Sequence, residues 1–185
     1  MVRGEVMKEL EGSRVLLRNW NMKDVDHMFE WAKDDRVGPN AGWKPHATKE
    51  ETMVIINSFI LNQEVWCIES KKEKKPIGSI GLHVDKVRDN PQALMIGYVL
   101  SPKYWGQGLM VECCELILKY AFEELNKEII TIDHFDFNYQ SRRVIEKLGF
   151  KYEGTLRKAK YRYDGLPINL CYYSMTREEY YEKRS

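Results

Sequence analysis

The stretch YVLSPKYWGQGLM, residues 98–110, decides the fold that we expect for this chain. The apolar run Ala93–Leu100 predicts a strand covered on both faces, Pro102 turns the chain, and Leu109–Leu125 predicts an apolar helix. Two glycines before that helix let the backbone approach a ligand and leave N–H groups without intrahelical partners. With the helix dipole, these donors suit an anion such as a pyrophosphate. The alternative is a tight strand-to-helix connection without a ligand.

A second informative stretch is NYQSRRVIEKLGF, residues 138–150, which follows a strand expected over Ile129–Phe135. Asn138 can cap a helix, Arg142 and Glu146 have the i,i+4 spacing of an ion pair, and Gly149 suits a left-handed C-terminal position. Read alone, this stretch describes an ordinary short helix.

The other elements complete a single domain of the α/β (α+β) class, with a mixed, mostly antiparallel central sheet and helices on both faces. A helix after Asn21 carries Val25, Met28, Phe29 and Ala32 on one face, and Gly38-Pro39-Asn40 and Gly42 break the chain. The runs Thr48–Glu51 and Thr176–Glu179 are expected capping boxes, the first followed by Met53, Ile56, Phe59 and Ile60 at helical spacing. Further strands are expected at Val15–Arg18, Val65–Ser70, Ile77–Val84, Phe150–Tyr152 and Ile168–Met175. Asp164-Gly165 predicts a turn. The basic segment Lys71–Pro76 is expected to be a solvated hairpin loop, with an anion site as the alternative.

Composition narrows the class of protein. The chain has 185 residues, 29 Lys+Arg against 28 Asp+Glu, and 43% hydrophobic residues, which predicts one globular domain over residues 1–185. A net charge of +1 gives no electrostatic footprint for nucleic acid or a membrane surface, and residues 1–10 lack the apolar centre of a secretory signal. The four cysteines show no metal-ligand spacing and are expected as buried thiols in the cytoplasm.

Taken together, the two stretches resemble the GNAT superfamily of acetyl-CoA-dependent N-acetyltransferases, and more closely its RimJ/RimL-type branch, which acetylates protein N-termini. The resemblance extends over residues 12–181. It rests on residues 96–98, 104–108, Asn138 with Ser141, 146–150, 153–157 and 173–175, together with Gly42–His46 and Glu50–Thr52.

Three positions depart from the family pattern. Trp105 stands where the wider superfamily has Gln or Arg, although Trp is usual in this branch. Met110 replaces a final Gly or Ala, so its side chain must point away from the phosphates. Ile145 occupies the place of a tyrosine that is thought to protonate the leaving thiolate in many relatives, so that acid is absent here.

The resemblance implies a set of acetyl-CoA-binding residues and no metal. They are Tyr98, Val99, Leu100, Gly106, Gln107, Gly108, Leu109, Met110, Val111, Asn138 and Ser141. A backbone N–H near Val99 or Leu100 would point at the acetyl carbonyl, and Ser141 would donate to the sulfur in place of the missing tyrosine. Arg142, Arg143 and Lys147 either meet the adenosine 3′-phosphate or are solvated.

The implied reaction is direct attack of an amine on the thioester. Deprotonating a lysine amine at pH 7 costs about 4.6 kcal/mol and a protein α-amine only about 1–1.4 kcal/mol, so an N-terminal amine needs weaker base assistance. Asp133 is the candidate base, since it alternates with Ile130 and Ile132 and so faces away from them. The alternatives are a salt-bridged or solvated Asp133, with His83, His134 or water as the base.

The acceptor amine is the part of the implied reaction that the sequence determines least. Ribosomal-protein-type N-termini are expected from the branch, and small amines such as amino acids, polyamines or antibiotics are the alternative. A non-catalytic CoA-binding module is a third hypothesis. The expected oligomeric state is a monomer or a homodimer. The candidate wall residues, each of which has core packing as an alternative, are Trp43, His46, Tyr161, Tyr163 and Tyr173.

Overall fold

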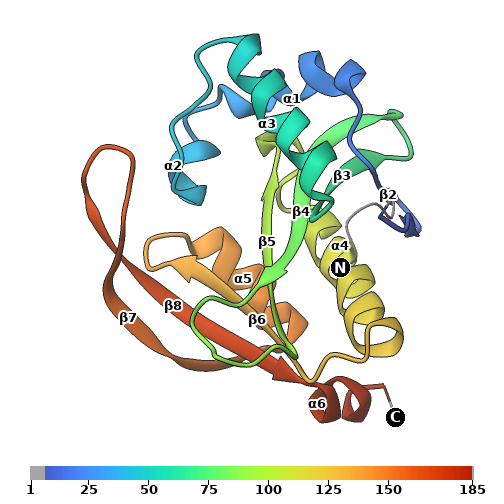
Figure 1. The fold of residues 1–185 in the computed structure, drawn as a ribbon, viewed down its shortest axis with the longest axis vertical. Coiled ribbons are helices and arrows are strands. Elements are labelled where there is room, and N and C mark those ends of the chain that lie inside the picture. Colours follow the sequence, from blue (N-terminus) through green and yellow to red (C-terminus); the bar gives the residue numbers. More distant parts are fainter. Residues whose placement is uncertain (1–6, 185) are drawn as a thin grey trace. The chain divides into compact units, whose positions relative to one another are not determined.

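The computed structural model describes residues 7–184, and Figure 1 shows their helices and strands. The segment 1–10, predicted to carry no signal sequence, lies partly outside the described residues. The chain folds into two compact units, which we describe separately: unit 1 runs to Gly81 and includes Tyr98–Cys113, whereas unit 2 comprises Leu82–Gly97 and the chain from Cys114 onward. Among the described helices, none combines the length and apolar character that crossing a bilayer requires.

Unit 1 is built on antiparallel strands. β1 (Leu10–Glu11) pairs with β2 (Val15–Arg18), β2 with β3 (Val65–Ser70), and β3 with β4 (Lys75–Val84). The end of β5 (Ala93–Leu100) follows β4 in the strand order. The helical elements of the unit are η1 (Met22–Asp24), α1 (Val25–Ala32), α2 (Gly38–Ala41), α3 (Lys49–Asn62), η2 (Pro102–Tyr104) and the start of α4 (Leu109–Lys119).

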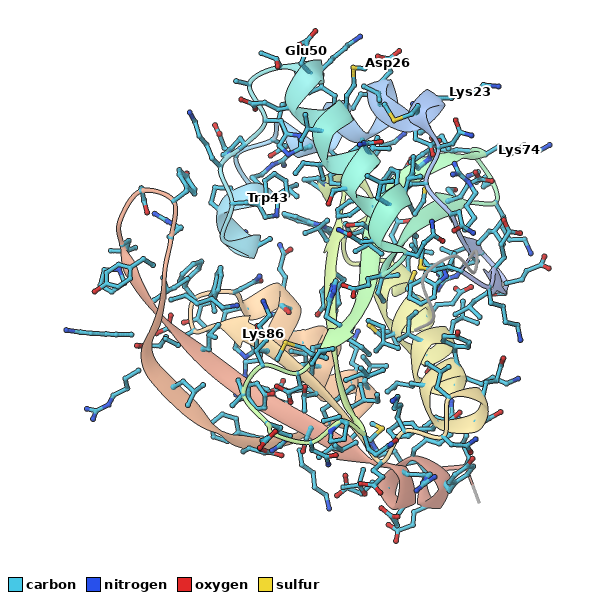
Figure 2. The ribbon with its side chains drawn as sticks, in the orientation of Figure 1. Lys23, Asp26, Trp43, Glu50, Lys74 and Lys86 are labelled. Carbon is cyan, nitrogen blue, oxygen red and sulfur yellow. The ribbon has the colours of Figure 1, made fainter. Side chains whose placement is uncertain are left out.

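The core of unit 1 is rich in tryptophan. Trp20, Met28, Trp31 and Ile56 are buried in one cluster, against which the half-buried side chains Trp43, Val99 and Trp105 pack together with residues of α1 and α3. Figure 2 shows Trp43 beside the short helix α2. The core therefore joins the early helices to the end of β5, where the glycine stretch begins.

Unit 2 holds the remaining strands. β5 pairs in parallel with β6 (Ile129–Phe135), β6 with β8 (Pro167–Thr176) and β8 with β7 (Lys151–Tyr161), both antiparallel. Its helical elements are the rest of α4, η3 (Tyr120–Glu124), α5 (Tyr139–Leu148) and α6 (Arg177–Glu182). The sheet is thus mixed and mostly antiparallel, as expected. Figure 1 shows the long hairpin of β7 and β8 and α6 directly after it.

Several predicted elements are confirmed. The strands at Val15–Arg18, Val65–Ser70, Ala93–Leu100 and Ile129–Phe135 have the predicted bounds. Gly149 ends α5 with φ 74°, and the second capping box is complete, because Thr176 and Glu179 accept from each other's backbone N–H groups.

Other predictions about the early segments are wrong in detail. Gly38–Ala41 is not a break but one helical turn, with Pro39 in its first turn and Gly42 as a left-handed end. The first capping box is half formed: Thr48 caps α3, but the Glu51 carboxylate accepts from the N–H of Ala47 instead of Thr48. Met53 is exposed, and Thr52 takes the buried position beside Ile56.

The later corrections concern the ends of helices and strands and the burial of β5. β4 begins at Lys75 rather than Ile77, and the helix predicted to Leu125 becomes π-helical from Tyr120. The strand predicted as Phe150–Tyr152 runs instead from Lys151 to Tyr161. Its side chains are almost all exposed and show no alternation, so the sequence carries no signal for the full length of the strand. β5 is not covered on both faces throughout, since Gly97 is exposed.

Candidate functional site

The glycine loop between η2 and α4 has a backbone conformation that favours glycine. Gly106 has φ 73° and Gly108 has φ 76°, a left-handed region that costs other residues free energy because of their Cβ atoms. Both glycines and Gln107 between them are exposed. A Cβ added at Gly106 would meet no atom within 4 Å, so the space beside this residue is open.

The amides of this loop form a set of unused donors. Among residues 7–184, the N–H groups of Gly106, Gln107 and Gly108 form no hydrogen bond. An i→i−4 bond runs from Glu112 to Gly108 at 3.2 Å, and the N–H groups of residues 109–111 precede it in the first turn of α4. Met110 is buried, so its side chain packs inside and leaves the loop surface to the backbone. These are the features an anion site at a helix N-terminus needs.

The loop is fixed at its entrance by two side chains. Trp105 donates from Nε1 to the carbonyl of Leu100 at 2.7 Å, and Tyr104 donates from its hydroxyl to Glu73 Oε1 at 2.8 Å. The hydrogen bond from Tyr104, with Lys75 and Lys103 nearby, lowers the pKa of Glu73 to about 2. Glu73, the single acidic residue of the basic loop Lys71–Pro76, therefore holds the side chain of Tyr104 just before the glycine loop. No local pattern could reveal this contact, because the two residues are 31 positions apart.

The end of β5 directs one backbone amide away from β4. A Cβ on Gly78 would lie 2.4 Å from the carbonyl oxygen of Val99, and the Ser101 N–H donates to Ile77 at 2.8 Å. Because backbone groups of successive strand residues point in opposite directions, the N–H of Leu100 faces away from β4. Of the two residues predicted to supply an oxyanion donor, Leu100 is therefore the one whose N–H does not face β4.

In unit 2, the candidate base Asp133 is a half-buried carboxylate on β6. Within the part of the chain that the structure describes, it forms no hydrogen bond or ion pair. Burial raises the pKa of Asp133 above its ordinary value, and the charges of Lys160 and His134 oppose this only in part. A carboxyl with a raised pKa is a stronger base when ionised, so this environment suits proton transfer.

The histidines proposed as alternatives differ in setting. His134 is buried, with Nδ1 2.8 Å from the carbonyl oxygen of Phe135 and Nε2 3.4 Å from the Tyr173 hydroxyl. Both ring nitrogens are thus occupied within the fold, which favours a structural role. His83 is half-buried on β4.

The helix α5 begins as its sequence predicts. The Asn138 side chain accepts from the Ser141 N–H at 3.1 Å, and Arg142 pairs with Glu146 at 2.7 Å. Ser141 is half-buried, whereas Ile145 is fully buried and packs as an ordinary core residue. The capping role of Asn138 is confirmed, and its proposed contact with the pantetheine arm stays a prediction.

The candidate wall residues do not share one environment. Tyr173 is buried, but Tyr161 and Tyr163 are exposed on the β7–β8 hairpin, so core packing does not explain the latter two. His46 is half-buried, with Nδ1 2.8 Å from the Thr52 hydroxyl and its ring 5.2 Å from that of Trp43. Burial lowers the pKa of His46, which keeps its imidazole neutral at pH 7.

A buried acid that sequence analysis missed is Asp85, whose carboxylate accepts from the hydroxyls of Tyr172 and Thr131 at 2.5 and 3.0 Å. Its partners are 87 and 46 positions away, so nothing in the neighbouring sequence points to them. The carboxylate therefore accepts hydrogen bonds from two strands of unit 2, β6 and β8.

The predicted site residues fall into two groups. Those of the strand end and the glycine loop, from Tyr98 to Val111, belong to unit 1, whereas Asp133, Asn138 and Ser141 belong to unit 2.

Comparison with known proteins gives a consistent result. The model of an acetyltransferase (GNAT) domain matches residues 14–151. The chain is 30% identical over 173 residues to an uncharacterized N-acetyltransferase, YoaA of Bacillus subtilis, covering 91% of this chain and 96% of the relative. It is 35% identical over 104 residues to the putative ribosomal N-acetyltransferase YdaF of the same species, covering 56% and 55%.

A solved structure agrees with these matches. The crystal structure of a GNAT-family acetyltransferase from Bacillus anthracis superposes with a TM-score of 0.83 at 26% identity and covers 93% of this chain and 100% of that one.

Proposed function

Because the chain belongs to the GNAT acetyltransferase family, we propose that it transfers the acetyl group of acetyl-CoA to the α-amine at a protein N-terminus, of the ribosomal-protein type. The observation that carries the proposal is the exposed glycine loop with its unused amides in unit 1. Support for the acceptor comes from the likeness to a putative ribosomal N-acetyltransferase and from the relative ease of deprotonating an α-amine.

The loop fits the pyrophosphate of acetyl-CoA. Its donors include the amides of Gly106, Gln107 and Gly108, its positive φ angles disfavour residues with a Cβ, and the space beside Gly106 is open. When bound, acetyl-CoA supplies a thioester whose carbonyl carbon an amine can attack. The helix dipole contributes about 0.3–1 kcal/mol per charge, so the amide hydrogen bonds supply most of the affinity.

Three residues of this chain then act on protons and charge. Asp133 removes a proton from the α-ammonium group, directly or through a water. The N–H of Leu100 stabilises negative charge that develops on the acetyl oxygen. Ser141 donates a hydrogen bond to the sulfur, because Ile145 has no proton to give.

A thiol-release assay tests the proposal. Purified protein is titrated with acetyl-CoA by calorimetry and then supplied with peptides that start with Ala or Ser, with the same peptides blocked at the N-terminus, and with polyamines and aminoglycosides. We expect thiol release with the free peptides alone. Release only with small amines would overturn the acceptor class, and tight binding without release on any amine would indicate a CoA-binding module.

Ser141→Ala is expected to lower kcat about tenfold, since hydrogen bonding to a developing thiolate strengthens only in the transition state. The KM for acetyl-CoA should stay within about twofold, because ground-state binding does not depend on this bond. Steady-state kinetics with a reactive peptide measures both values, and Ser141→Thr is the matched control that keeps a hydroxyl. An unchanged kcat in the alanine variant would remove Ser141 from the mechanism.

A further inference from the structure

Arg14, the residue before β2, contacts both the glycine loop and the first turn of α4. Its Nη1 donates to the carbonyl of Gln107 at 2.8 Å, and its Nε donates to Glu112 Oε2 at 2.8 Å. The Arg14 N–H also donates to Glu112 Oε1 at 2.8 Å. The Arg14 carbonyl accepts from the Lys71 N–H at 3.0 Å, so the backbone that carries this guanidinium is itself anchored next to β3.

We propose that Arg14 is the positioning residue of the glycine loop: its guanidinium holds the peptide between Gln107 and Gly108 so that the Gly108 N–H faces the ligand side. In a trans peptide the C=O and the N–H point in opposite directions, and no peptide bond among the described residues is cis. Because Arg14 binds the Gln107 oxygen, the Gly108 N–H points away from that contact, and within residues 7–184 it forms no hydrogen bond.

The neighbourhood of Gly108 supports the same assignment. A Cβ on Gly108 would lie 3.7 Å from Arg14 Nη2, so the guanidinium lies against this residue as well as against Gln107. A loop of exposed glycines is flexible by itself, and a side chain that fixes one of its peptide planes lowers the entropy lost on binding. The planar fork of arginine can hold two acceptors at once, which a lysine ammonium at the end of a flexible stem does poorly.

Glu112 has a second effect in this arrangement. A carboxylate in the first turn of α4 stabilises the helix but repels an anion bound at the same end. Burial would raise the pKa of Glu112, but hydrogen bonds from Arg14 and Ser13 outweigh it and leave the pKa below its ordinary value. Glu112 is therefore ionised at pH 7, and Arg14 neutralises its charge beside the proposed phosphate site.

The inference rests on the proposed function, and its test separates the two. Wild-type protein, Arg14→Met, Arg14→Lys and Arg36→Met are compared by calorimetry with CoA, by kinetics, and by amide NMR of the ligand-free protein. Arg36 is the matched control, since it is an exposed arginine of unit 1 paired with Asp34 at 2.6 Å. Arg14→Lys keeps the charge and most of the stem, so it remains informative if Arg14→Met folds poorly.

We expect both Arg14 variants to raise the Kd for CoA about tenfold or more, with kcat at saturating acetyl-CoA within about twofold of wild type. The Gly108 amide resonance should shift or broaden in the ligand-free Arg14 variants and stay unchanged in Arg36→Met. Wild-type affinity in Arg14→Lys, a loss confined to kcat, or an unperturbed Gly108 amide would overturn the inference while the proposed function stands. Failure of the wild-type protein to bind CoA would refute the proposed function and the inference with it.

Discussion

Replacing Gly106 by aspartate is expected to weaken acetyl-CoA binding about 100-fold, whereas asparagine at the same position should weaken it only about fivefold. Both side chains tolerate the left-handed region in which Gly106 lies, at φ 73°, and both would enter open space. They differ in one negative charge. Two unit charges about 5 Å apart repel by about 3 kcal/mol at an effective dielectric constant near 20, which is about two orders of magnitude in affinity.

Calorimetry with CoA at low and high salt measures this difference. The aspartate penalty should shrink as salt rises, because an exposed charge is screened, and the asparagine penalty should not change. Thermal denaturation of the ligand-free variants is the control, and the two melting temperatures should agree closely. Equal affinities of Gly106→Asp and Gly106→Asn would mean that no phosphate lies beside this loop, and the proposed acetyl-CoA site would be wrong.

The parts of the fold that sequence predicted well are those in which a local pattern and tertiary packing agree. Ala93–Leu100 and Ile129–Phe135 are apolar runs that become strands with the expected bounds, and Gly149 ends α5 because only glycine takes a positive φ there without strain. The strand Lys151–Tyr161 shows the reverse case. It is held by pairing with β8 rather than by burial of one face, so its side chains carry no period of two.

The same division applies to the candidate site. The conformations of Gly106 and Gly108 and the cap at Asn138 are local, so the sequence predicts them. The residues that hold the loop are not local, since Arg14 is 93 positions from Gln107 and Glu73 is 31 from Tyr104. Contacts of this length depend on the strand order β1-β2-β3-β4, which no single stretch of sequence specifies.

Asp133→Asn is expected to lower kcat by about 100- to 1,000-fold at pH 7, because the α-ammonium of the acceptor then loses its proton acceptor. The deficit should shrink above about pH 8, where the α-amine is already largely deprotonated in solution. The Kd for acetyl-CoA should change little. Rates measured from about pH 6 to 9 on one reactive peptide test this, with Asp136→Asn as the matched control, an exposed carboxylate hydrogen-bonded to Asn169. A pH–rate profile that matches wild type would exclude Asp133 as the base.

Stability should change in the opposite direction to activity, which separates a catalytic Asp133 from a structural one. Since burial raises the pKa of Asp133 in the folded protein, its ionised form is disfavoured there relative to the unfolded chain. The cost is absent at a pH below the unfolded-state pKa, and it grows until the pH exceeds the folded-state pKa. Asp133→Asn removes it, so its melting temperature should exceed that of wild type at about pH 7 but not at about pH 3. If the Asp133 carboxylate stabilised the fold, its replacement would lower the melting temperature. A variant that is more stable and less active would therefore assign Asp133 to the chemistry rather than to the fold.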